Sequence, residues 1–473
     1  SRSSISTMGE NIQQSLLAQS VDDQVAQVQL KSDPRNVVDA RLTANGIHIG
    51  KTLILADDVA GIKDAGGNSI TVHSYPRRGH GCFGARERAE VEHTIFFGAD
   101  DGEKQRWLDE WGRLWNRGAV RKLLVLINPV GGKKQARSIW DKVACKMFHQ
   151  AGIEVEVVET THQGHAVEIV SSADLSAVDG IVCVSGDGLM VEVVNGLQQR
   201  EDAHAMGAIP LGIIPAGSGN GLATSFLFKG GEKCDATSSV LAIIRGHVEK
   251  LDAARVEQEG ETRFYSVLSI GWGLASDTDV ESDAIRWCGP VRFTIQGVLN
   301  IAKKRVYQGS LRLLSPPTNN ETFPNSTTSE HQPTQDGTRW KTLEGSFSMV
   351  WAVNVTHCAF DNMTAPYAEL CDGCFDVLVV REEVPRSTIF GMFLEMEKGN
   401  HVKNPSVEYY KAQELIWEPL TSEGMLCVDG ELVACGKDTV PNLPSMHQAK
   451  MLPMDYGATH IKIQQGLMTA FVA

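Results

Sequence analysis

The sequence predicts a parallel α/β nucleotide-binding domain followed by a β-sandwich-like domain, with a small strand-and-helix module ahead of both. From about 118 to 250, short apolar stretches alternate with amphipathic ones, which is typical of a parallel sheet covered by helices. From about 251 to 473 the pattern changes to strands with few long helices. From 35 to 117, several short alternating stretches precede one amphipathic stretch that is rich in tryptophan.

Composition places the chain among soluble globular proteins. It has 473 residues, of which 42% are hydrophobic and 22% charged. The net charge of -14 argues against a nucleic-acid partner, which would require a basic surface. The first thirty residues lack the apolar segment of a signal peptide, and no apolar run reaches the ~18 residues of a transmembrane helix. Ten cysteines are too few for a disulfide scaffold, so we expect free thiols and a cytoplasmic location.

The N-terminal region divides into a tail and a module. Residues 1–34 are polar and aperiodic, which predicts a disordered tail. The module at 35–117 resembles a pleckstrin-homology-like domain, because strands precede a helix whose apolar side chains share one stripe. Its basic residues Lys51, Arg77 and Arg78 either contact anionic lipid or are solvated surface. The expected strands are Val37–Leu42, Lys51–Leu55, Ser69–Ser74 and Val91–Phe97, and the helix is Asp100–Trp115, with Trp107, Leu108, Trp111, Leu114 and Trp115 on the stripe.

The α/β region, 118–250, alternates strand and helix. Ligands bind such sheets at the carboxyl ends of the strands. The expected strands are Lys122–Asn128, Ile153–Val158, Gly180–Ser185 and the stretch that begins at Leu211, and the expected helices are Lys133–Gln150, His165–Ser172 and Leu189–Leu197.

The region 251–473 contains mostly strands and one low-complexity interruption. The stretch 315–340 is rich in Thr, Asn, Ser and Pro, which predicts a disordered insertion. Cys371 and Cys374 form a lone C-x-x-C, for which a chance turn is favoured over a metal or redox site. The expected strands are Arg263–Ser269, Ser346–Asn354, Cys374–Val380, Leu415–Trp417 and Thr459–Ile463.

Three glycine-rich turns follow strands of the α/β region: Asn128–Lys133, Ser185–Gly188 and Gly217–Gly221. Each opens into a helix, so together they offer a polyphosphate-sized surface of backbone N–H groups. They match neither the Rossmann nor the P-loop fingerprint. Gly-Asp-Gly is also an ordinary tight turn. A carboxylate repels phosphate, however, so Asp187 is expected to serve chemistry or metal binding.

These turns, in this order, resemble the lipid kinases of the diacylglycerol-kinase catalytic superfamily. Further motifs make the chain similar to the sphingosine (long-chain base) kinases, and the resemblance covers roughly Lys122–Glu431 without the insertion. The stretch Thr364–Gly373 is similar to plant members. The additional motifs are Thr160–Ala166, Gly271–Gly273, Asp277–Asp279, Glu281, Ser282, Arg286, Arg292, Met396–His401 and Asp429–Glu431.

The resemblance implies an ATP-dependent kinase that phosphorylates the primary hydroxyl of sphingosine- or sphinganine-type bases. Mg²⁺ would arrive with ATP, no separate metal cage is readable, and the β-rich domain would bind the lipid. Because the substrate is insoluble in water, we expect peripheral contact with intracellular membranes and no transmembrane segment.

The resemblance also assigns residues to roles. Asp187 is the catalytic base that takes the proton from the lipid hydroxyl. The departure from some relatives lies at His162 and Gln163, where arginines are missing. ATP-binding residues would be Asn128, Pro129, Val130, Thr160, Thr161, His162, Gln163, Gly164, Glu192, Gly217, Ser218, Gly219, Arg286, Arg292, Asp429, Gly430 and Glu431, and substrate-binding residues Ser185, Gly186, Asp187, Gly188 and Asp279.

Alternatives remain at this point. A ceramide or diacylglycerol kinase fits less well, because Asp279 suits an ammonium group that those lipids lack. Single motifs are also compatible with a NAD kinase or with a non-catalytic lipid-binding scaffold. Any one of Arg286, Arg292 or Asp279 could instead be a surface ion-pair partner. Apolar residues after Asp279 either line a lipid-tail pocket or belong to ordinary core, and core is favoured: Ile285, Trp287, Phe293, Ile295, Val298, Leu299 and Ile301.

Overall fold

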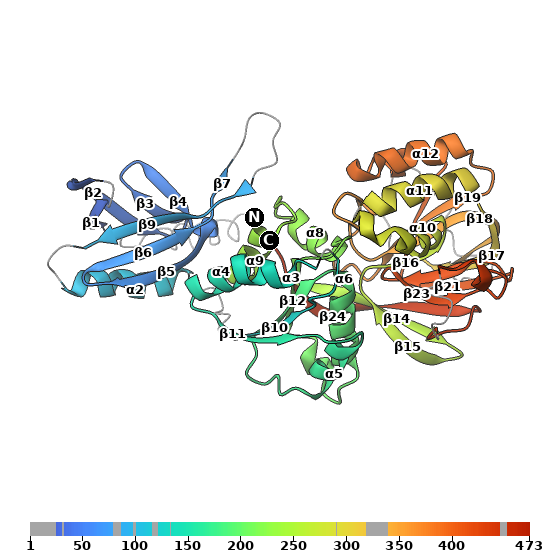
Figure 1. Ribbon diagram of the computed structural model, residues 1–473, viewed down its shortest axis with the longest axis horizontal. Coiled ribbons are helices and arrows are strands. Elements are labelled where there is room, and N and C mark those ends of the chain that lie inside the picture. Colours follow the sequence, from blue (N-terminus) through green and yellow to red (C-terminus); the bar gives the residue numbers. More distant parts are fainter. Residues whose placement is uncertain are drawn as a thin grey trace, which may run out of the picture. The chain divides into compact units, whose positions relative to one another are not determined.

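The chain forms two compact units. The first comprises Ser1–Ala119, Lys146–Ile153 and Ile244–Gly246, and the second contains the remainder. The computed structural model describes residues 25–30, 33–78, 87–97, 101–115, 122–132, 134–289, 291–317, 339–444 and 452–473 (Figure 1).

The first unit is an antiparallel sheet with one helix. Its elements are β1 (Val25–Leu30), β2 (Asp33–Thr43), β3 (Gly46–Ile49), β4 (Thr52–Leu55), η1 (Ala56–Asp58), β5 (Val59–Gly66), β6 (Ser69–Ser74), β7 (Arg77–Arg78), β8 (Glu87–Arg88), β9 (Val91–Phe96) and α2 (Asp101–Trp115). Among the described residues, seven strands pair in the order β4-β3-β2-β1-β9-β6-β5. Trp107 of α2 is buried among the apolar side chains of the sheet, as the helical stripe predicts.

Strand β1 and the first residues of β2 lie inside the predicted disordered tail, so the prediction is wrong for residues 25–30, 33 and 34. Residues Val25–Leu30 pair with β2 and β9, which satisfies backbone groups that a tail would leave to water. The stretch alternates Ala26, Val28 and Leu30 with glutamines, and this period of two is the overlooked signal. Residues 1–24 lie outside the described part of the chain.

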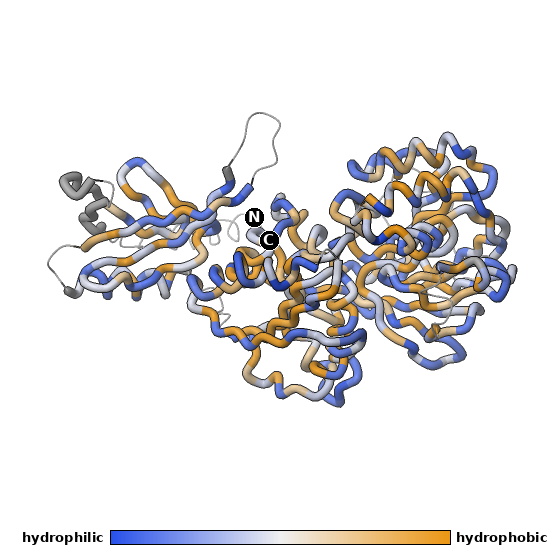
Figure 2. The backbone as a smooth tube through the Cα atoms, viewed as in Figure 1, coloured by the Kyte–Doolittle hydropathy of each residue, from blue (hydrophilic) through white to orange (hydrophobic). Residues whose placement is uncertain are grey.

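The second unit begins with a parallel sheet in the order β11-β10-β12-β13. Helices cover it, so its inner strands are buried along nearly their whole length and are apolar (Figure 2). The predicted helix Lys133–Gln150 is present as three consecutive helical segments, of which the middle one is a π-helix. The elements along this stretch of the chain are β10 (Lys122–Ile127), α3 (Ala136–Ile139), η2 (Trp140–Ala144), α4 (Cys145–Gln150), β11 (Glu154–Glu159), α5 (His165–Ser172), β12 (Gly180–Ser185), α6 (Asp187–Gln198), α7 (Ala203–Met206), β13 (Pro210–Pro215), α8 (Gly221–Phe228) and α9 (Ala236–Arg245). Most of α4 and the last residues of α9 are grouped with the first unit.

The β-rich half of the second unit carries three helices on one side of its strands (Figure 1). These helices are α10 (Leu274–Ser282), α11 (Val291–Lys303) and α12 (Arg386–Glu395). An aromatic cluster around the buried Trp272 fills the interior, with Trp417 at 5.5 Å between ring centroids. The other elements are β14 (Val248–Gln258), β15 (Glu261–Ser266), β16 (Ser269–Gly273), η3 (Asp283–Cys288), β17 (Tyr307–Leu314), β18 (Trp340–Val353), β19 (Phe375–Arg381), η4 (Met396–Lys398), η5 (Asn400–Lys403), β20 (Glu408–Ala412), β21 (Glu414–Pro419), β22 (Met425–Val428), β23 (Glu431–Cys435), η6 (Val440–Asn442) and β24 (Thr459–Phe471).

Strand β24 joins the two halves into one mixed sheet. Its C-terminal end pairs in parallel with β13, and its N-terminal end pairs antiparallel with β21. Strand β14 pairs antiparallel with it over nearly its whole length, from His460 to Phe471. The predicted strand Thr459–Ile463 is therefore present but longer. The β-rich half therefore supplies a strand of the parallel sheet.

Three further expectations concern the predicted insertion, the cysteines and membrane-spanning helices. Residues 318–338 of the predicted insertion lie outside the described residues, whereas Trp340 already belongs to β18. The nine cysteines of the described part are free thiols, Cys371 and Cys374 among them. None of the described helices is long and apolar enough to span a bilayer.

Candidate active site

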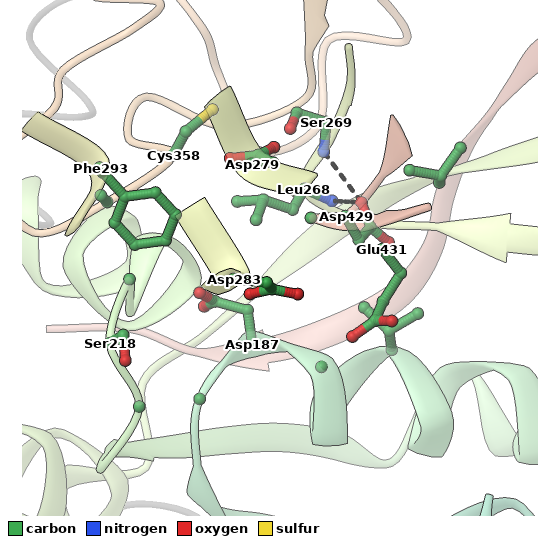
Figure 3. A pocket seen from close by; sticks show the side chains of 18 of the residues that line it. Asp187, Ser218, Leu268, Ser269, Asp279, Asp283, Phe293, Cys358, Asp429 and Glu431 are labelled. Carbon is green, nitrogen blue, oxygen red and sulfur yellow. Dashed lines mark hydrogen bonds between the residues drawn. The ribbon is translucent and has the colours of Figure 1, made fainter. Parts of the chain in front are cut away.

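A cavity of about 1460 Å³ opens within the second unit. On one side it is lined by the turns that follow β10, β12 and β13, and on the other by α10, α11, α12 and the turn between β22 and β23. Figure 3 shows Asp187 near the centre, with Asp279, Asp283 and Glu431 of the β-rich half around the same space. The cavity therefore lies at the carboxyl edge of the parallel strands, where ligands of such sheets bind.

The three glycine-rich turns touch one another backbone to backbone. A Cβ atom on Gly132 would lie 2.6 Å from the carbonyl oxygen of Ala216. A Cβ on Gly217 would lie 2.3 Å from the Cα of Gly186, so these two turns leave no room for side chains. The sequence pattern predicted one shared edge, and the structure brings the turns together there. Glycine is required at these points because the chains approach too closely for any larger residue.

Asp187 is the first residue of α6, and its carboxylate is held by the start of another helix. Its two oxygens accept the backbone N–H groups of Gly221 at 3.0 Å and Leu222 at 2.9 Å, in the first turn of α8. Asn220, in the left-handed region at φ 59°, directs that turn and bonds both the N–H and the carbonyl of Gly217. Burial raises the pKa of Asp187 to about 6, although the two N–H donors oppose the shift. The group is therefore ionised at neutral pH and close to the range of an effective base.

Asn128 and Glu192, both predicted to bind the nucleotide, accept hydrogen bonds from backbone N–H groups. Asn128 Oδ1 accepts the N–H groups of Val130 and Gly131, at 3.1 and 3.0 Å, and so folds the first turn. Glu192 accepts the N–H of Ala166 at 3.2 Å, which ties α6 to the first turn of α5. Both residues line the cavity while holding its wall in place.

Asp429 lines the cavity, but its carboxylate is fully engaged. It accepts the N–H groups of Val267, Leu268 and Ser269 and the hydroxyl of Ser266, at 2.7 to 3.1 Å. Figure 3 shows the contacts with Leu268 and Ser269. Burial raises its pKa, and the four donors counteract the rise. The observed contacts make Asp429 the anchor of the turn between β15 and β16.

Asp279 on α10 lies in the part of the cavity that the β-rich half lines. Burial raises its pKa to about 7, Arg292 lowers it, and Asp283 and Glu431 raise it further. A half-buried carboxylate with this environment favours a cationic partner, because an ammonium would stabilise its ionised form.

The predicted arginines meet at Asp283, which the sequence analysis did not select. Oδ1 of Asp283 accepts Nε–H of Arg286 at 2.8 Å and an Nη1–H of Arg292. Arg292 is buried, and its guanidinium lies 4.3 Å from the ring centroid of Phe293. Asp283 follows Asp279 by four residues, and this helical spacing is the signal that could have revealed it.

Most predicted site residues line the cavity; Pro129, Thr161 and Ser185 do not. Ser185 is buried and donates to the carbonyl of Gly186. Lining residues that the sequence did not indicate include Lys134, Ser269, Thr278, Asp283, Cys358 and Asn362, whereas Gly131 and Gly132 belong to the predicted turn Asn128–Lys133. The predicted residues that line it are Asn128, Val130, Thr160, His162, Gln163, Gly164, Gly186, Asp187, Gly188, Glu192, Gly217, Ser218, Gly219, Asp279, Arg286, Arg292, Asp429, Gly430 and Glu431.

The far part of the cavity is apolar. Its lining there includes Leu274, Ile301, Met349, Trp351, Phe293 and Phe393, which suits a hydrocarbon chain. The preference for ordinary core is wrong for Trp287, Ile295, Val298 and Leu299, which are exposed.

Two family descriptions match the chain. Residues 122–256 match the diacylglycerol kinase catalytic domain. Residues 330–449 match the YegS C-terminal NAD kinase beta sandwich-like domain. A diacylglycerol kinase structure from Bacillus anthracis has the same fold, with a TM-score of 0.50 at 19% identity over 75% of this chain and 97% of that one.

Curated relatives cover more of the sequence at higher identity. Sphingosine kinase 1 of Arabidopsis thaliana is 36% identical over 429 residues, which cover 86% of this chain and 87% of that protein. Human sphingosine kinase 1 is 32% identical over 330 residues, which cover 66% of this chain and 86% of that protein. The plant relative thus matches a larger share of this chain. With the catalytic domain and the converging turns, these matches show that the chain belongs to the sphingosine kinase family.

Proposed function

We propose that the protein transfers the γ-phosphoryl group of ATP to the primary hydroxyl of a sphingoid base such as sphinganine. The observation that carries this proposal is the meeting of three phosphate-sized glycine turns beside one base, Asp187, in a cavity whose far part is apolar. The curated relatives are named sphingosine kinases, which supports the same chemistry.

The transfer is a direct in-line displacement. Asp187 takes the proton of the attacking hydroxyl, and the N–H groups of Gly221 and Leu222 keep its carboxylate in place. Arg286 and Arg292 donate to the phosphate oxygens on which negative charge accumulates. The glycine turns give backbone N–H groups to the remaining oxygens.

Mg²⁺ fits this site as a companion of the nucleotide. Asp429 is already engaged by four donors, which leaves it unsuited to a metal. In the part of the chain that the structure describes, the group with metal-ligand spacing is His73, Glu90 and Glu92 of the first unit. Mg²⁺ would neutralise phosphate charge, and Asp187 and Glu431 are two of the acidic side chains that line the same cavity.

Asp279 is proposed to bind the substrate's ammonium group. With its pKa at about 7, Asp279 carries a proton below that pH and loses its attraction for the amine. The KM for sphinganine is therefore expected to rise about tenfold per pH unit below pH 7 and to level off above it. Steady-state kinetics from pH 5.5 to 8.5 measure the effect.

Substrate comparison tests both the proposed activity and the role of Asp279. Wild-type protein should phosphorylate sphinganine at least tenfold faster than ceramide or diacylglycerol, and Asp279→Asn should remove the preference together with the pH dependence of KM. Equal turnover of ceramide, or an unaltered pH profile in the variant, would reject the assignment. No turnover of any of the three lipids would reject the proposed function.

The surface of α11 and its neighbours is proposed to contact the membrane. The side of α11 that is buried carries the polar residues Arg292, Gln296 and Asn300, whereas Ile295 and Leu299 are exposed. This reverses the usual polarity of a surface helix. Trp287 is 85% and Leu394 63% exposed, and both also line the cavity, so the apolar surface continues into the proposed lipid site.

The double substitution Ile295→Gln with Leu299→Gln is expected to weaken binding to phosphatidylcholine vesicles containing sphinganine about tenfold. Two aliphatic side chains would no longer enter the bilayer, and even partial insertion exceeds the ~1.4 kcal/mol of a tenfold change. Vesicle sedimentation measures the binding. Leu420→Gln removes an exposed apolar residue after β21 and should leave sedimentation as in wild type. Wild-type sedimentation of the double variant would remove the membrane role of this surface.

The domain boundaries are proposed as 35–117 for a pleckstrin-homology-like module, 118–250 for the catalytic domain and 251–473 for the lipid-substrate domain. The strand order of the first unit, with α2 after the last strand, supports the first assignment, but β1 moves the start of this module from 35 to Val25. Strand β24 qualifies the division, because it pairs with β13 of the catalytic region.

A further inference from the structure

Asp283 holds two arginines on one carboxylate oxygen. Arg286 donates through Nε at 2.8 Å and Arg292 through Nη1. The side chains of Asp283 and Arg292 are each only 10% exposed. Water therefore screens the Asp283–Arg292 pair far less than a surface ion pair, and losing one partner would leave the other charge poorly compensated.

The contacts with Asp283 leave other arginine donors for a ligand. A guanidinium has five N–H groups, and Asp283 engages one nitrogen of each arginine. Nε of Arg292 is buried and has no acceptor among the described residues. A buried donor without an acceptor is unfavourable, so the guanidinium of Arg292 gains from an additional acceptor.

The same charges act on Asp279, one helical turn before Asp283. Arg292 stabilises the ionised form of Asp279, and Asp283 and Glu431 oppose it. When a triphosphate binds both arginines, its negative charge offsets theirs. Asp279 and Asp283 then lack a compensating cation, and an ammonium group nearby can supply it.

We propose that Asp283 is a positioning residue that directs Arg286 and Arg292 toward the triphosphate and couples nucleotide binding to binding of the substrate's ammonium. The inference rests on the proposed function, because it takes the arginines as the phosphate side and Asp279 as the amine side. Coupling between two binding sites is reciprocal, so each ligand tightens the other by the same factor. A neutral lipid provides no cation and gains nothing from this arrangement.

The coupling is measurable as nucleotide affinity on the full chain. Titration calorimetry with Mg²⁺ and the non-hydrolysable analogue AMP-PNP is performed in neutral detergent micelles, with sphinganine, with ceramide or with neither. Sphinganine should tighten AMP-PNP binding about fivefold or more, within the usual range of coupling between sites, and ceramide less than twofold. Asp283→Asn should reduce the gain from sphinganine to less than about twofold and weaken AMP-PNP binding without lipid.

Two control variants distinguish the effect of the position of Asp283 from the effect of its charge. Glu397→Gln removes one acid from the cavity lining on η4 and should keep the full gain. Asp283→Glu retains the charge and should restore at least half of the gain, which also covers the case in which Asp283→Asn does not fold.

Three different results would contradict, in turn, the role of Asp283, the coupling and the phosphate site. Wild-type coupling in folded Asp283→Asn would overturn the role of Asp283. The absence of any sphinganine effect in wild type would overturn the coupling. Wild-type AMP-PNP affinity in both Arg286→Ala and Arg292→Ala would instead reject the phosphate site of the proposed function.

Discussion

Replacing Asp187 with asparagine is expected to lower kcat by about 10³-fold and to change the KM for ATP by less than about threefold. The amide cannot accept the proton of the lipid hydroxyl, so the attacking oxygen must lose it to water. The N–H groups of Gly221 and Leu222 still fix the position of the side chain, although the new NH₂ group faces one of them. Initial rates with labelled ATP and sphinganine give both constants.

The pH dependence of kcat in the wild-type protein tests the same role of Asp187. The base must be ionised, and the pKa of Asp187 is about 6. We therefore expect kcat to fall about tenfold per unit below pH 6 and to stay level above it, while the limb assigned to Asp279 appears in KM near pH 7. Glu201→Gln, an exposed charge change after α6, serves as the folding-matched control. Full activity of Asp187→Asn at any pH would exclude it as the base.

Replacing Arg292 with alanine is expected to lower kcat/KM for ATP by about 10²–10³-fold. Its guanidinium is buried beside the cavity, where a charge-assisted hydrogen bond to phosphate is stronger than in water. Arg286 is 59% exposed, so Arg286→Ala should cost about tenfold. Arg292→Lys should recover only part of the loss, because a lysine lacks the forked donors.

Two controls accompany the arginine variants. Removing Arg292 leaves Asp283 and Asp279 less compensated, so the thermal unfolding midpoint is recorded with the kinetics. Arg312→Ala removes an exposed arginine that lies over Trp340, away from the cavity lining, and should not alter kcat/KM. Unchanged kinetics in stable Arg292→Ala would mean that the triphosphate is bound elsewhere.

Elements whose local pattern matches their final environment could be predicted from sequence. Gly180–Ser185 is continuously apolar because both faces of β12 are buried, and its predicted bounds equal the observed ones. The three turns could be found because glycine is required where Gly132, Gly186 and Gly217 touch. Their meeting point followed from the rule that parallel strands share an edge.

Features that depend on tertiary partners could not be read locally. The alternation in β1 covers only six residues within a polar stretch, and it becomes decisive only because β2 and β9 offer pairing edges. Asp429 has a spacing that resembles a nucleotide contact, but only the fold reveals four donors around its carboxylate. The outward apolar side of α11 looked like core because periodicity identifies a face without saying what covers it.

The position of β24 has a consequence for biosynthesis. The nucleotide-binding sheet needs Thr469 and Ala470 beside Pro210 and Leu211, so one edge of β13 waits for residues that the ribosome adds some 260 positions later. A growing chain can form β10, β11 and β12 early, yet it exposes an apolar strand edge until translation of β24 is complete. A chain that stops before β24 is therefore expected to leave this edge of β13 unpaired and to aggregate more readily than the full chain.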